Sequence, residues 1–259
     1  MGVSSKVALT PYYEQNSITI YHGDCLAVMP TLRAGSIDAI ITDLPYGTTA
    51  CKWDVVIPFA PMWEQVKRLL KPHGAFVTTA SQPFTSMLVM SNLDWFKYCW
   101  VWDKNNSAGF ATVKYRPFIV TEDVCVFSQG ASVYNPQMQT RGKSRQKGFG
   151  GRASELYGIK PRKGPVNNTY HPKNILAFSK INQVDCDHPT QKPIALYEYL
   201  IRTYTNEGDV VLDFCLGSGT TALACRRLGR RCVGAEISEE YCQIAVKRLE
   251  DEPEPLFPG

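Results

Sequence analysis

The stretch Ile37-Asp38-Ala39-Ile40-Ile41-Thr42-Asp43-Leu44-Pro45-Tyr46-Gly47 decides the fold of this chain. Its apolar run, residues 37–41, predicts a buried strand. A carboxylate, a proline and an aromatic ring follow where the strand ends, and proline cannot continue a sheet ladder. Ligands of open α/β sheets bind at the carboxyl ends of the strands. The stretch therefore predicts an α/β sheet with a ligand site at the end of this strand.

The residues at that strand end favour a particular ligand chemistry. Pro45 holds Leu44 in an extended conformation, which fixes the direction of the Leu44 carbonyl. The Asp43 carboxylate and this carbonyl are then two acceptors beside the flat ring of Tyr46. A planar group with an exocyclic NH2 suits this arrangement, with two donors for two acceptors and one face stacked. The alternatives are a loop-capping carboxylate at Asp43 and plain core packing of Tyr46.

Length and composition indicate an ordinary soluble globular protein. The chain has 259 residues, of which 44% are hydrophobic and 20% charged. This length allows one large α/β domain with an insertion, or two small domains. The net charge of +4 permits a polyanionic partner without requiring one.

Cysteine usage and the absence of targeting signals indicate a cytoplasmic protein. The nine cysteines are scattered without zinc-ligand spacing, which favours free thiols in a reducing compartment and no bound metal. Cys186 and His188 offer the one alternative, two ligands for a metal. No signal peptide or membrane-spanning apolar run is present, so no membrane partner is expected.

Strand and helix patterns alternate along the first half of the chain. Strands are predicted at 17–21, 75–79, 96–101 and 120–127, and helices at 61–70 and 81–90. This alternation is typical of a mostly parallel sheet covered by helices. Asp24 follows the first strand at the start of a helical pattern, where it is either an N-cap or a second ligand contact.

The segment 128–187 differs in composition from the rest of the chain. Between residues 141 and 173, nine lysines and arginines face one acid, Glu155, and no hydrophobic period is visible. One interpretation is a solvated, flexible insertion. The other is a segment that binds phosphates and reads bases, which makes binding salt-sensitive. The candidate DNA contacts are Arg141, Lys143, Arg145, Lys147, Arg152, Arg162 and Lys163.

A second motif lies near the end of the chain. The apolar run 210–212 leads into Asp213 and the turn Gly217-Ser218-Gly219-Thr220-Thr221-Ala222, and a second strand, 231–235, ends in Glu236. Glycines let the backbone approach a ligand, the helix start supplies N–H donors, and such a carboxylate binds ribose hydroxyls. The motif also fits the dinucleotide fingerprint. Only one strand clearly follows it, whereas the dinucleotide-binding domain of a dehydrogenase needs several, so a dehydrogenase is disfavoured. The other strands of this sheet must come from earlier in the chain, which places the half that contains Asp43 before the glycine-rich half in sequence.

These motifs resemble S-adenosylmethionine-dependent DNA methyltransferases that modify an exocyclic amino nitrogen, of the class whose catalytic motif precedes the cofactor motif. The resemblance covers nearly the whole chain. It rests on residues 43–46 as the Asp-Pro-Pro-Tyr-type motif, on His188-Pro189-Thr190-Gln191-Lys192-Pro193, and on the glycine-rich turn. Leu44 replaces the usual first proline, and Asp213-Phe214-Cys215 replaces the usual Asp-Pro-Phe.

The resemblance implies an architecture and a set of roles. The fold is a Rossmann-like, mostly parallel methyltransferase sheet in circularly permuted order, with a catalytic half at 1–127, a basic target-recognition insertion at 128–187 and a cofactor-binding half at 188–259. The catalytic residues are Asp43, Leu44, Pro45 and Tyr46. The residues that bind S-adenosylmethionine are Asp24, His188, Thr190, Lys192, Asp213, Phe214, Cys215, Gly217, Ser218, Gly219, Thr220 and Glu236.

Within these roles, Glu236 holds the ribose, Asp24 the adenine, and His188, Thr190 and Lys192 the methionine end of the cofactor. The target base is flipped out of double-stranded DNA. Tyr46 stacks on it, while Asp43 and Leu44 accept its amino hydrogens.

The resemblance also implies an activity. We expect methylation of adenine N6, because Asp at the first motif position resembles the adenine-modifying members. The alternatives are cytosine N4 methylation, a non-catalytic DNA-binding protein on this scaffold, a protein or RNA methyltransferase, and a nicotinamide oxidoreductase. Members of the class often pair, so a homodimer and a cognate restriction endonuclease are further expected partners.

Overall fold

Strand β3 (Ile37–Asp43) is formed by the apolar run that opens the catalytic motif. Ala39 and Ile41 are buried in one hydrophobic core, and Ile37 and Ile40 in a second core on the other face. A strand covered on both faces needs apolar residues at nearly every position, which explains the continuous run. The sheet around β3 therefore has a packed layer on each side.

The computed structural model describes residues 10–49, 51, 54–108, 113–149, 152–160, 162–180 and 191–252. They divide into two compact units, one of Pro136–Lys173 and one of the residues before and after it. The larger unit contains a nine-stranded sheet in the order β1-β2-β11-β10-β3-β4-β6-β5-β9. Besides β3, its strands are β1 (Tyr13–Gln15), β2 (Ile18–His22), β4 (Leu70–Ala80), β5 (Phe96–Ala108), β6 (Ile119–Phe127), β9 (Ile175–Ala177), β10 (Val210–Asp213) and β11 (Arg231–Glu236).

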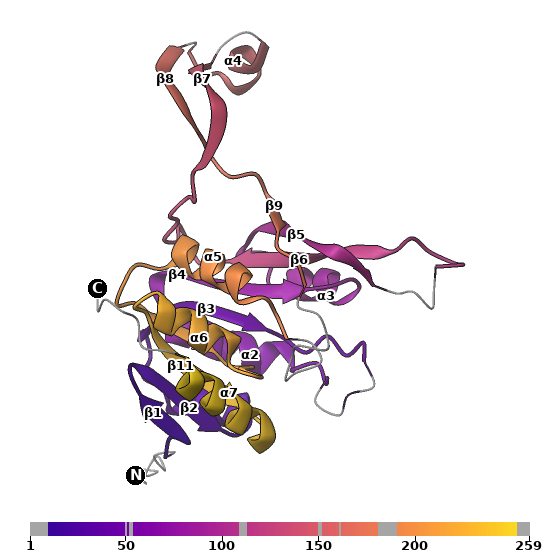
Figure 1. Cartoon of the computed structure of the whole chain (residues 1–259), viewed down its shortest axis with the longest axis vertical. Coiled ribbons are helices and arrows are strands. Elements are labelled where there is room, and N and C mark those ends of the chain that lie inside the picture. The colour runs from indigo at the N-terminus through magenta and orange to yellow at the C-terminus, as the bar shows by residue number, and fades with distance from the viewer. Residues whose placement is uncertain are drawn as a thin grey trace. The chain divides into compact units, whose positions relative to one another are not determined.

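Five neighbouring strands of this sheet, β2, β11, β10, β3 and β4, run parallel. Strand β6 is antiparallel to both β4 and β5, and β1 is antiparallel to β2. The C-terminal strands β10 and β11 lie between the N-terminal strands β2 and β3, so segments far apart in sequence lie side by side (Figure 1). This order confirms the predicted α/β sheet, mostly parallel and permuted.

Helices cover both faces of the sheet, as Figure 1 shows. Buried residues of three C-terminal helices fill the core that contains Ala39, and those of three N-terminal helices fill the core that contains Ile40. The first group is α5 (Ile194–Tyr204), α6 (Thr220–Arg227) and α7 (Glu239–Asp251). The second is α1 (Cys25–Val28), which continues as η1 (Met29–Thr31), with α2 (Phe59–Leu69) and α3 (Phe84–Ser91).

The smaller unit is built around an antiparallel pair, β7 (Gln139–Phe149) and β8 (Arg162–Tyr170), with α4 (Arg152–Tyr157) between them in sequence. Regular structure is therefore present within 128–187 even though no hydrophobic period was visible there. A two-stranded ribbon has no large core to bury, so its strands need no apolar period. The unit lies inside the predicted target-recognition segment, whose limits stay a prediction.

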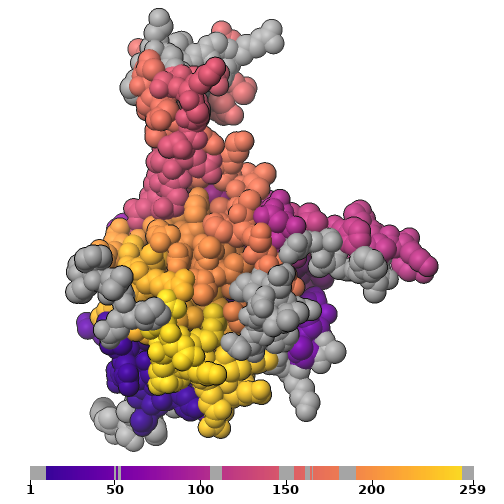
Figure 2. Space-filling model, in the orientation of Figure 1, coloured from indigo at the N-terminus to yellow at the C-terminus, as the bar shows by residue number. Residues whose placement is uncertain are grey.

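Strands β5 and β6 extend beyond the rest of the larger unit, and Figure 2 shows their ends projecting from its surface. Their pairing runs from Phe96 with Phe127 to Ala108 with Ile119. In the part of the chain that the structure describes, no helix combines the length and the apolar character needed to cross a membrane.

Candidate active site

A pocket of about 400 Å³ lies at the carboxyl ends of β2, β11, β10 and β3. Both predicted motifs line it, and so does the strand-end residue Glu236. Parallel neighbours bring their carboxyl ends to one edge of the sheet, which is why motifs from opposite ends of the chain meet here. The predicted site residues that line the pocket are Asp24, Asp43, Leu44, Pro45, Tyr46, Lys192, Asp213, Phe214, Cys215, Gly217, Ser218, Thr220 and Glu236.

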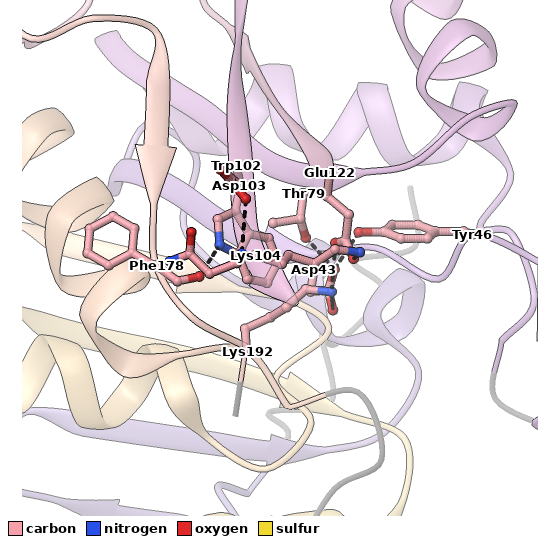
Figure 3. A network of polar contacts seen from close by, with 10 residues as sticks. Asp43, Tyr46, Thr79, Trp102, Asp103, Lys104, Glu122, Phe178 and Lys192 are labelled. Carbon is pink, nitrogen blue, oxygen red and sulfur yellow. Dashed lines mark hydrogen bonds and ion pairs between the residues drawn. The ribbon is translucent and has the colours of Figure 1, made fainter. Parts of the chain in front are cut away.

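The Asp43 carboxylate is the most heavily contacted group of the catalytic motif (Figure 3). Its Oδ1 accepts hydrogen bonds from the hydroxyls of Tyr46, at 3.0 Å, and of Thr79. Its Oδ2 lies 3.0 Å from the ammonium of Lys192. Thr79 pairs with Asp43 in the parallel register of β3 and β4, so both side chains emerge at the same point of the sheet edge. The carboxylate is thus fixed in place while it remains half-buried at the pocket.

Tyr46 is a hydrogen-bond donor as well as a flat surface. Its ring stacks on Phe84 with centroids 5.3 Å apart and an interplanar angle of 28°. Burial raises the pKa of Tyr46 well above its ordinary value, and the charges of Asp43 and Glu122 raise it further. The phenol therefore stays neutral and donates to Asp43. With one ring face against Phe84, stacking of a ligand is restricted to the other face.

The loop after Tyr46 is closed by Asp54. Its carboxylate accepts hydrogen bonds from the backbone N–H groups of Gly47, Thr48 and Thr49 at 2.7–2.9 Å. Burial alone would raise the pKa of Asp54, but these hydrogen bonds outweigh it and lower the pKa below its ordinary value. Asp54 therefore remains ionised and holds the loop that forms one wall of the pocket.

The glycine-rich turn between β10 and α6 is held against β11. Leu216 donates to the Ala235 carbonyl at 3.0 Å, and Gly217 donates to Glu236 Oε2 at 2.7 Å. Gly219 has a φ of +80°, and a Cβ there would lie 2.8 Å from the Cβ of Ala245 on α7. Only glycine combines this left-handed conformation with such a close approach.

Glu236 ends β11 inside the pocket. Besides Gly217, it accepts a hydrogen bond from the Ser238 backbone at 2.8 Å through Oε1. Burial raises its pKa even though these backbone donors lower it. Each carboxylate oxygen has about two acceptor sites, so each retains capacity for a ligand hydroxyl.

Asp213 lines the pocket but is buried, and its carboxylate holds the motif together. It accepts hydrogen bonds from Thr42 at 2.6 Å, Thr221 at 2.5 Å and the Cys215 backbone at 3.1 Å. Burial raises the pKa of Asp213 to about 6, although these hydrogen bonds lower it. Asp213 therefore anchors β10, β3 and the start of α6 to one another.

The remaining predicted residues fall into three groups. Asp24 caps α1 by accepting from the Leu26 N–H at 2.8 Å and also lines the pocket, so the cap interpretation is confirmed and the ligand contact stays a prediction. Lys192 contacts Asp43 and lines the pocket. His188 and Thr190 lie outside the described residues.

The predicted DNA contacts lie in the smaller unit. Lys143 and Arg145 are exposed on β7, and the Arg141 guanidinium lies over the Tyr170 ring of β8, 4.7 Å from its centroid. Lys147 also belongs to β7, Arg152 to α4, and Arg162 and Lys163 to β8.

Several residues at the site were not identified from the sequence, above all Thr42, Thr79, Glu122 and Asp54. A signal existed for Thr79, because it ends the strand predicted at 75–79. The other three depend on register and loop closure between distant segments, for which the sequence carries no local pattern.

The fold and the site together define an α/β enzyme of the methyltransferase class, with both predicted motifs in one pocket at one edge of the sheet. The chain matches the family model of the DNA methylase family, N6_N4_Mtase, over residues 37–247, and it belongs to that family. The predicted family and fold are thus confirmed, and the protein is a DNA methyltransferase. The match decides against the oxidoreductase and the protein or RNA methyltransferase alternatives.

Relatives with similar sequences are themselves DNA methyltransferases. Type II methyltransferase M.HpaI of Haemophilus parainfluenzae is 30% identical over 88% of this chain and 73% of that protein. DNA adenine methyltransferase YhdJ of Escherichia coli (strain K12) is 30% identical over 90% of this chain and 82% of that protein.

Two solved structures have the same fold. The M1.HpyAVI–SAM complex has a TM-score of 0.61 and 29% identity, and the match covers 89% of this chain and 99% of that chain. The cytosine-N4-specific PvuII DNA methyltransferase has a TM-score of 0.68, with 93% of this chain and 89% of that chain covered. Its identity is 21%, so this likeness concerns the fold alone.

Proposed function

We propose that this enzyme transfers a methyl group from S-adenosyl-L-methionine to adenine N6 in DNA. The observation that carries the proposal is that the Asp43 carboxylate, the glycine-rich turn after β10 and Glu236 at the end of β11 line one pocket. An acceptor for an amino group and a cradle for a nucleoside then face the same space. The runner-up target is cytosine N4, whose amino group presents the same two donors.

Adenine is favoured by two considerations. The first motif position is Asp43, which resembles the adenine-modifying members of the family. A relative with 30% identity, YhdJ, is named a DNA adenine methyltransferase. The structural likeness to the cytosine-N4-specific PvuII enzyme is compatible with cytosine N4 as the target but does not favour it over adenine N6.

The residues present fit S-adenosyl-L-methionine, the methyl donor of this enzyme. Gly217 and Gly219 have φ values of +53° and +80°, which bring the backbone turn close to the pocket. Glu236 retains acceptor capacity for the ribose hydroxyls, and the apolar side chains of Phe214 and Leu216 line the same wall. When bound, the cofactor supplies an electrophilic methyl group on a positively charged sulfur.

The side chains of the catalytic motif act on the target amino group. Asp43 and the Leu44 carbonyl accept its two hydrogens, which draws the nitrogen lone pair out of conjugation with the ring. Positive charge develops on that nitrogen as the new bond forms, and the fixed Asp43 carboxylate stabilises it. The nitrogen then passes one proton along its hydrogen bond to the Asp43 carboxylate, from which the proton leaves to solvent. Because this mechanism rests on positioning and electrostatics, it requires no covalent enzyme intermediate.

The base must leave the duplex to reach this pocket. We propose that the ribbon of β7 and β8 binds the duplex, because a two-stranded ribbon fits the major groove of DNA. Exposed Lys143 and Arg145 supply charge for phosphates, and Arg141 is held over the Tyr170 ring. Relatives such as M.HpaI are type II methyltransferases, so we also propose a cognate endonuclease as partner, together with a homodimer and a cytoplasmic location.

One experiment separates these possibilities. The purified chain is incubated with methyl-labelled cofactor and unmethylated DNA, and the DNA is digested to nucleosides and analysed by mass spectrometry. We expect label in N6-methyladenine. Label in N4-methylcytosine would show that the target is cytosine N4 instead of adenine N6. DNA binding without any label would show that the protein is a non-catalytic DNA-binding protein. Sequencing of the modified DNA then gives the recognised site.

A further inference from the structure

A chain of four charged side chains, two of them buried and two partly buried, runs from the Asp43 carboxylate to Lys104 on β5 (Figure 3). Asp43 Oδ2 lies 3.0 Å from Lys192 Nζ, which lies 3.3 Å from Glu122 Oε2. Glu122 Oε1 in turn lies 3.1 Å from Lys104 Nζ. The side chains of Lys104, Lys192 and Glu122 are 6%, 10% and 15% exposed, so solvent screens these charges weakly. The two cations and two anions balance formally.

The reversed direction of β6 brings Glu122 to the catalytic edge. Strand β6 is antiparallel to β4, so its first residues lie where β4 ends, and Ala80 pairs with Asp123. Glu122 pairs with Trp102 of β5, whose ring lies 5.8 Å from Lys192 Nζ. Glu122 does not line the pocket described above. Its direct contact toward Asp43 among the described residues is Lys192.

The acceptor capacity of Asp43 shows why the position of Lys192 matters. A carboxylate oxygen has about two acceptor sites. Oδ1 of Asp43 already accepts from Tyr46 and Thr79, whereas Oδ2 contacts Lys192 alone among the described residues. Oδ2 is thus the oxygen with a free site for the target amino group. The ammonium of Lys192 occupies one acceptor site of Oδ2, so its position determines which acceptor site remains open to the target amino group.

Glu122 fixes both the place and the effect of that ammonium. Burial alone would lower the pKa of Lys192, but the Asp43 and Glu122 carboxylates outweigh it and raise the pKa. Oε2 of Glu122 accepts no hydrogen bond from any described residue, so the charge of Lys192 is what offsets its burial. Without Glu122, Asp43 would be the one remaining carboxylate beside the ammonium of Lys192 among the described residues, so the same Asp43 charge would have to offset both this ammonium and the nitrogen that becomes positive during methyl transfer, which opposes the reaction.

We propose that Glu122 is a positioning residue for methyl transfer, which holds and neutralises Lys192 so that Asp43 Oδ2 stays open to the target amino group. This inference rests on the proposed function. It assigns Lys192 to the orientation of Asp43, whereas the family resemblance alone assigned it to the methionine end of the cofactor.

The test compares Glu122→Gln with two further variants. Glu122→Gln keeps the shape and removes the charge, so we expect kcat to fall roughly 10- to 100-fold, as for other groups that orient a reacting residue. The KM values for cofactor and DNA stay near those of the wild type. Glu122→Asp keeps the charge and restores part of kcat. Glu198→Gln is the matched control, because Glu198 also contacts two basic side chains, Arg202 and Arg227, each at 3.4 Å.

A double-mutant cycle separates positioning from plain stability. Lys192→Met removes the ammonium and leaves Lys104 as the counter-ion of Glu122. If Glu122 acts through Lys192, adding Glu122→Gln to Lys192→Met lowers kcat no further, whatever its effect on the melting temperature through the loss of the Lys104 ion pair. Additive losses of kcat in the double variant would overturn the proposal.

Folding and activity are followed separately in these experiments. Cofactor binding, measured by calorimetry, and thermal melting establish that each variant is folded. If Glu122→Gln does not fold, Glu122→Asp is used in its place. A wild-type protein that methylates no DNA would refute the proposed function. A folded Glu122→Gln variant with wild-type kcat would refute the role of Glu122 alone.

Discussion

Thr42 Oγ1 donates a hydrogen bond of 2.6 Å to Asp213 Oδ1 and so joins the end of β3 to the end of β10. One residue belongs to the catalytic strand and the other to the cofactor strand. The other oxygen of Asp213 accepts from Thr221 in the first turn of α6. Beyond the pairing of β3 with β10, a single buried carboxylate therefore ties the two halves of the pocket together.

This carboxylate makes stability depend on pH. Burial raises the pKa of Asp213 from 3.8 to about 6, so the folded state binds its proton more tightly than the unfolded state. Its contribution to the free energy of unfolding is present in full below about pH 4 and is lost as pH rises through 6. The loss amounts to about 3 kcal/mol. Urea unfolding from pH 4 to 7.5 should show this fall for the wild type relative to Asp213→Asn, and parallel curves would contradict it.

Replacement of Asp43 by alanine should abolish methyl transfer without unfolding the protein. The variant loses the acceptor for the target amino group, and we expect kcat to fall at least about a thousandfold. Lys192 keeps Glu122 as its counter-ion, so no isolated buried charge results. Cofactor affinity, measured by calorimetry, should remain that of the wild type. A variant that methylates DNA at the normal rate would remove Asp43 from the mechanism.

Gly219→Ala tests the close packing of the cofactor turn. An added Cβ meets the Cβ of Ala245 at 2.8 Å and its Cα at 3.1 Å, in a residue with a φ of +80°. Backbone strain and overpacking together should lower the free energy of unfolding by about 2–4 kcal/mol. Gly35→Ala is the control, with a φ of +62° and no atom within 4 Å of the new Cβ. Strain alone there costs about 1–2 kcal/mol, and equal losses in the two variants would rule out the steric contact.

Lys143→Ala tests the basic ribbon as a DNA-binding element, because Lys143 is exposed on β7. We expect weaker DNA binding and a salt dependence, log K against log salt, that is shallower by about 0.9 because one phosphate contact is lost. Cofactor affinity should not change. Lys71→Ala is the control, because Lys71 is 45% exposed near the start of β4, at the edge of the sheet away from the pocket. The ribbon assignment fails if both variants have the same salt dependence, measured by fluorescence anisotropy.

Local patterns were sufficient to predict most of the framework. The apolar run of β3, the glycine turn after β10 and the acid that ends β11 each carry a signal within a few residues. The parallel direction of their strands follows from the intervening helices, so the meeting of Asp43 with Glu236 in one pocket could be anticipated.

The direction of β6 carries no comparable signal. Residues 120–127 were predicted as a strand, but nothing in them indicates that β6 runs antiparallel to β4. Glu122 therefore gave no sign of lying near Asp43, and Lys192 gave no sign of its two carboxylate partners. The ribbon of β7 and β8 escaped prediction for a different reason, because its polar strands have no buried face to impose a period.

The position of β10 and β11 between β2 and β3 has a consequence during translation. The ribosome synthesises β2 and β3 early and synthesises β10 and β11, which lie between them in the sheet, late. The strands β2 and β3 therefore cannot take their final places in the sheet until β10 and β11 have emerged. A nascent chain that has emerged only as far as β9 possesses Asp43 but no turn to hold the methyl donor. We therefore expect the enzyme to be inactive until Glu236 has left the exit tunnel, so that only completed chains methylate DNA.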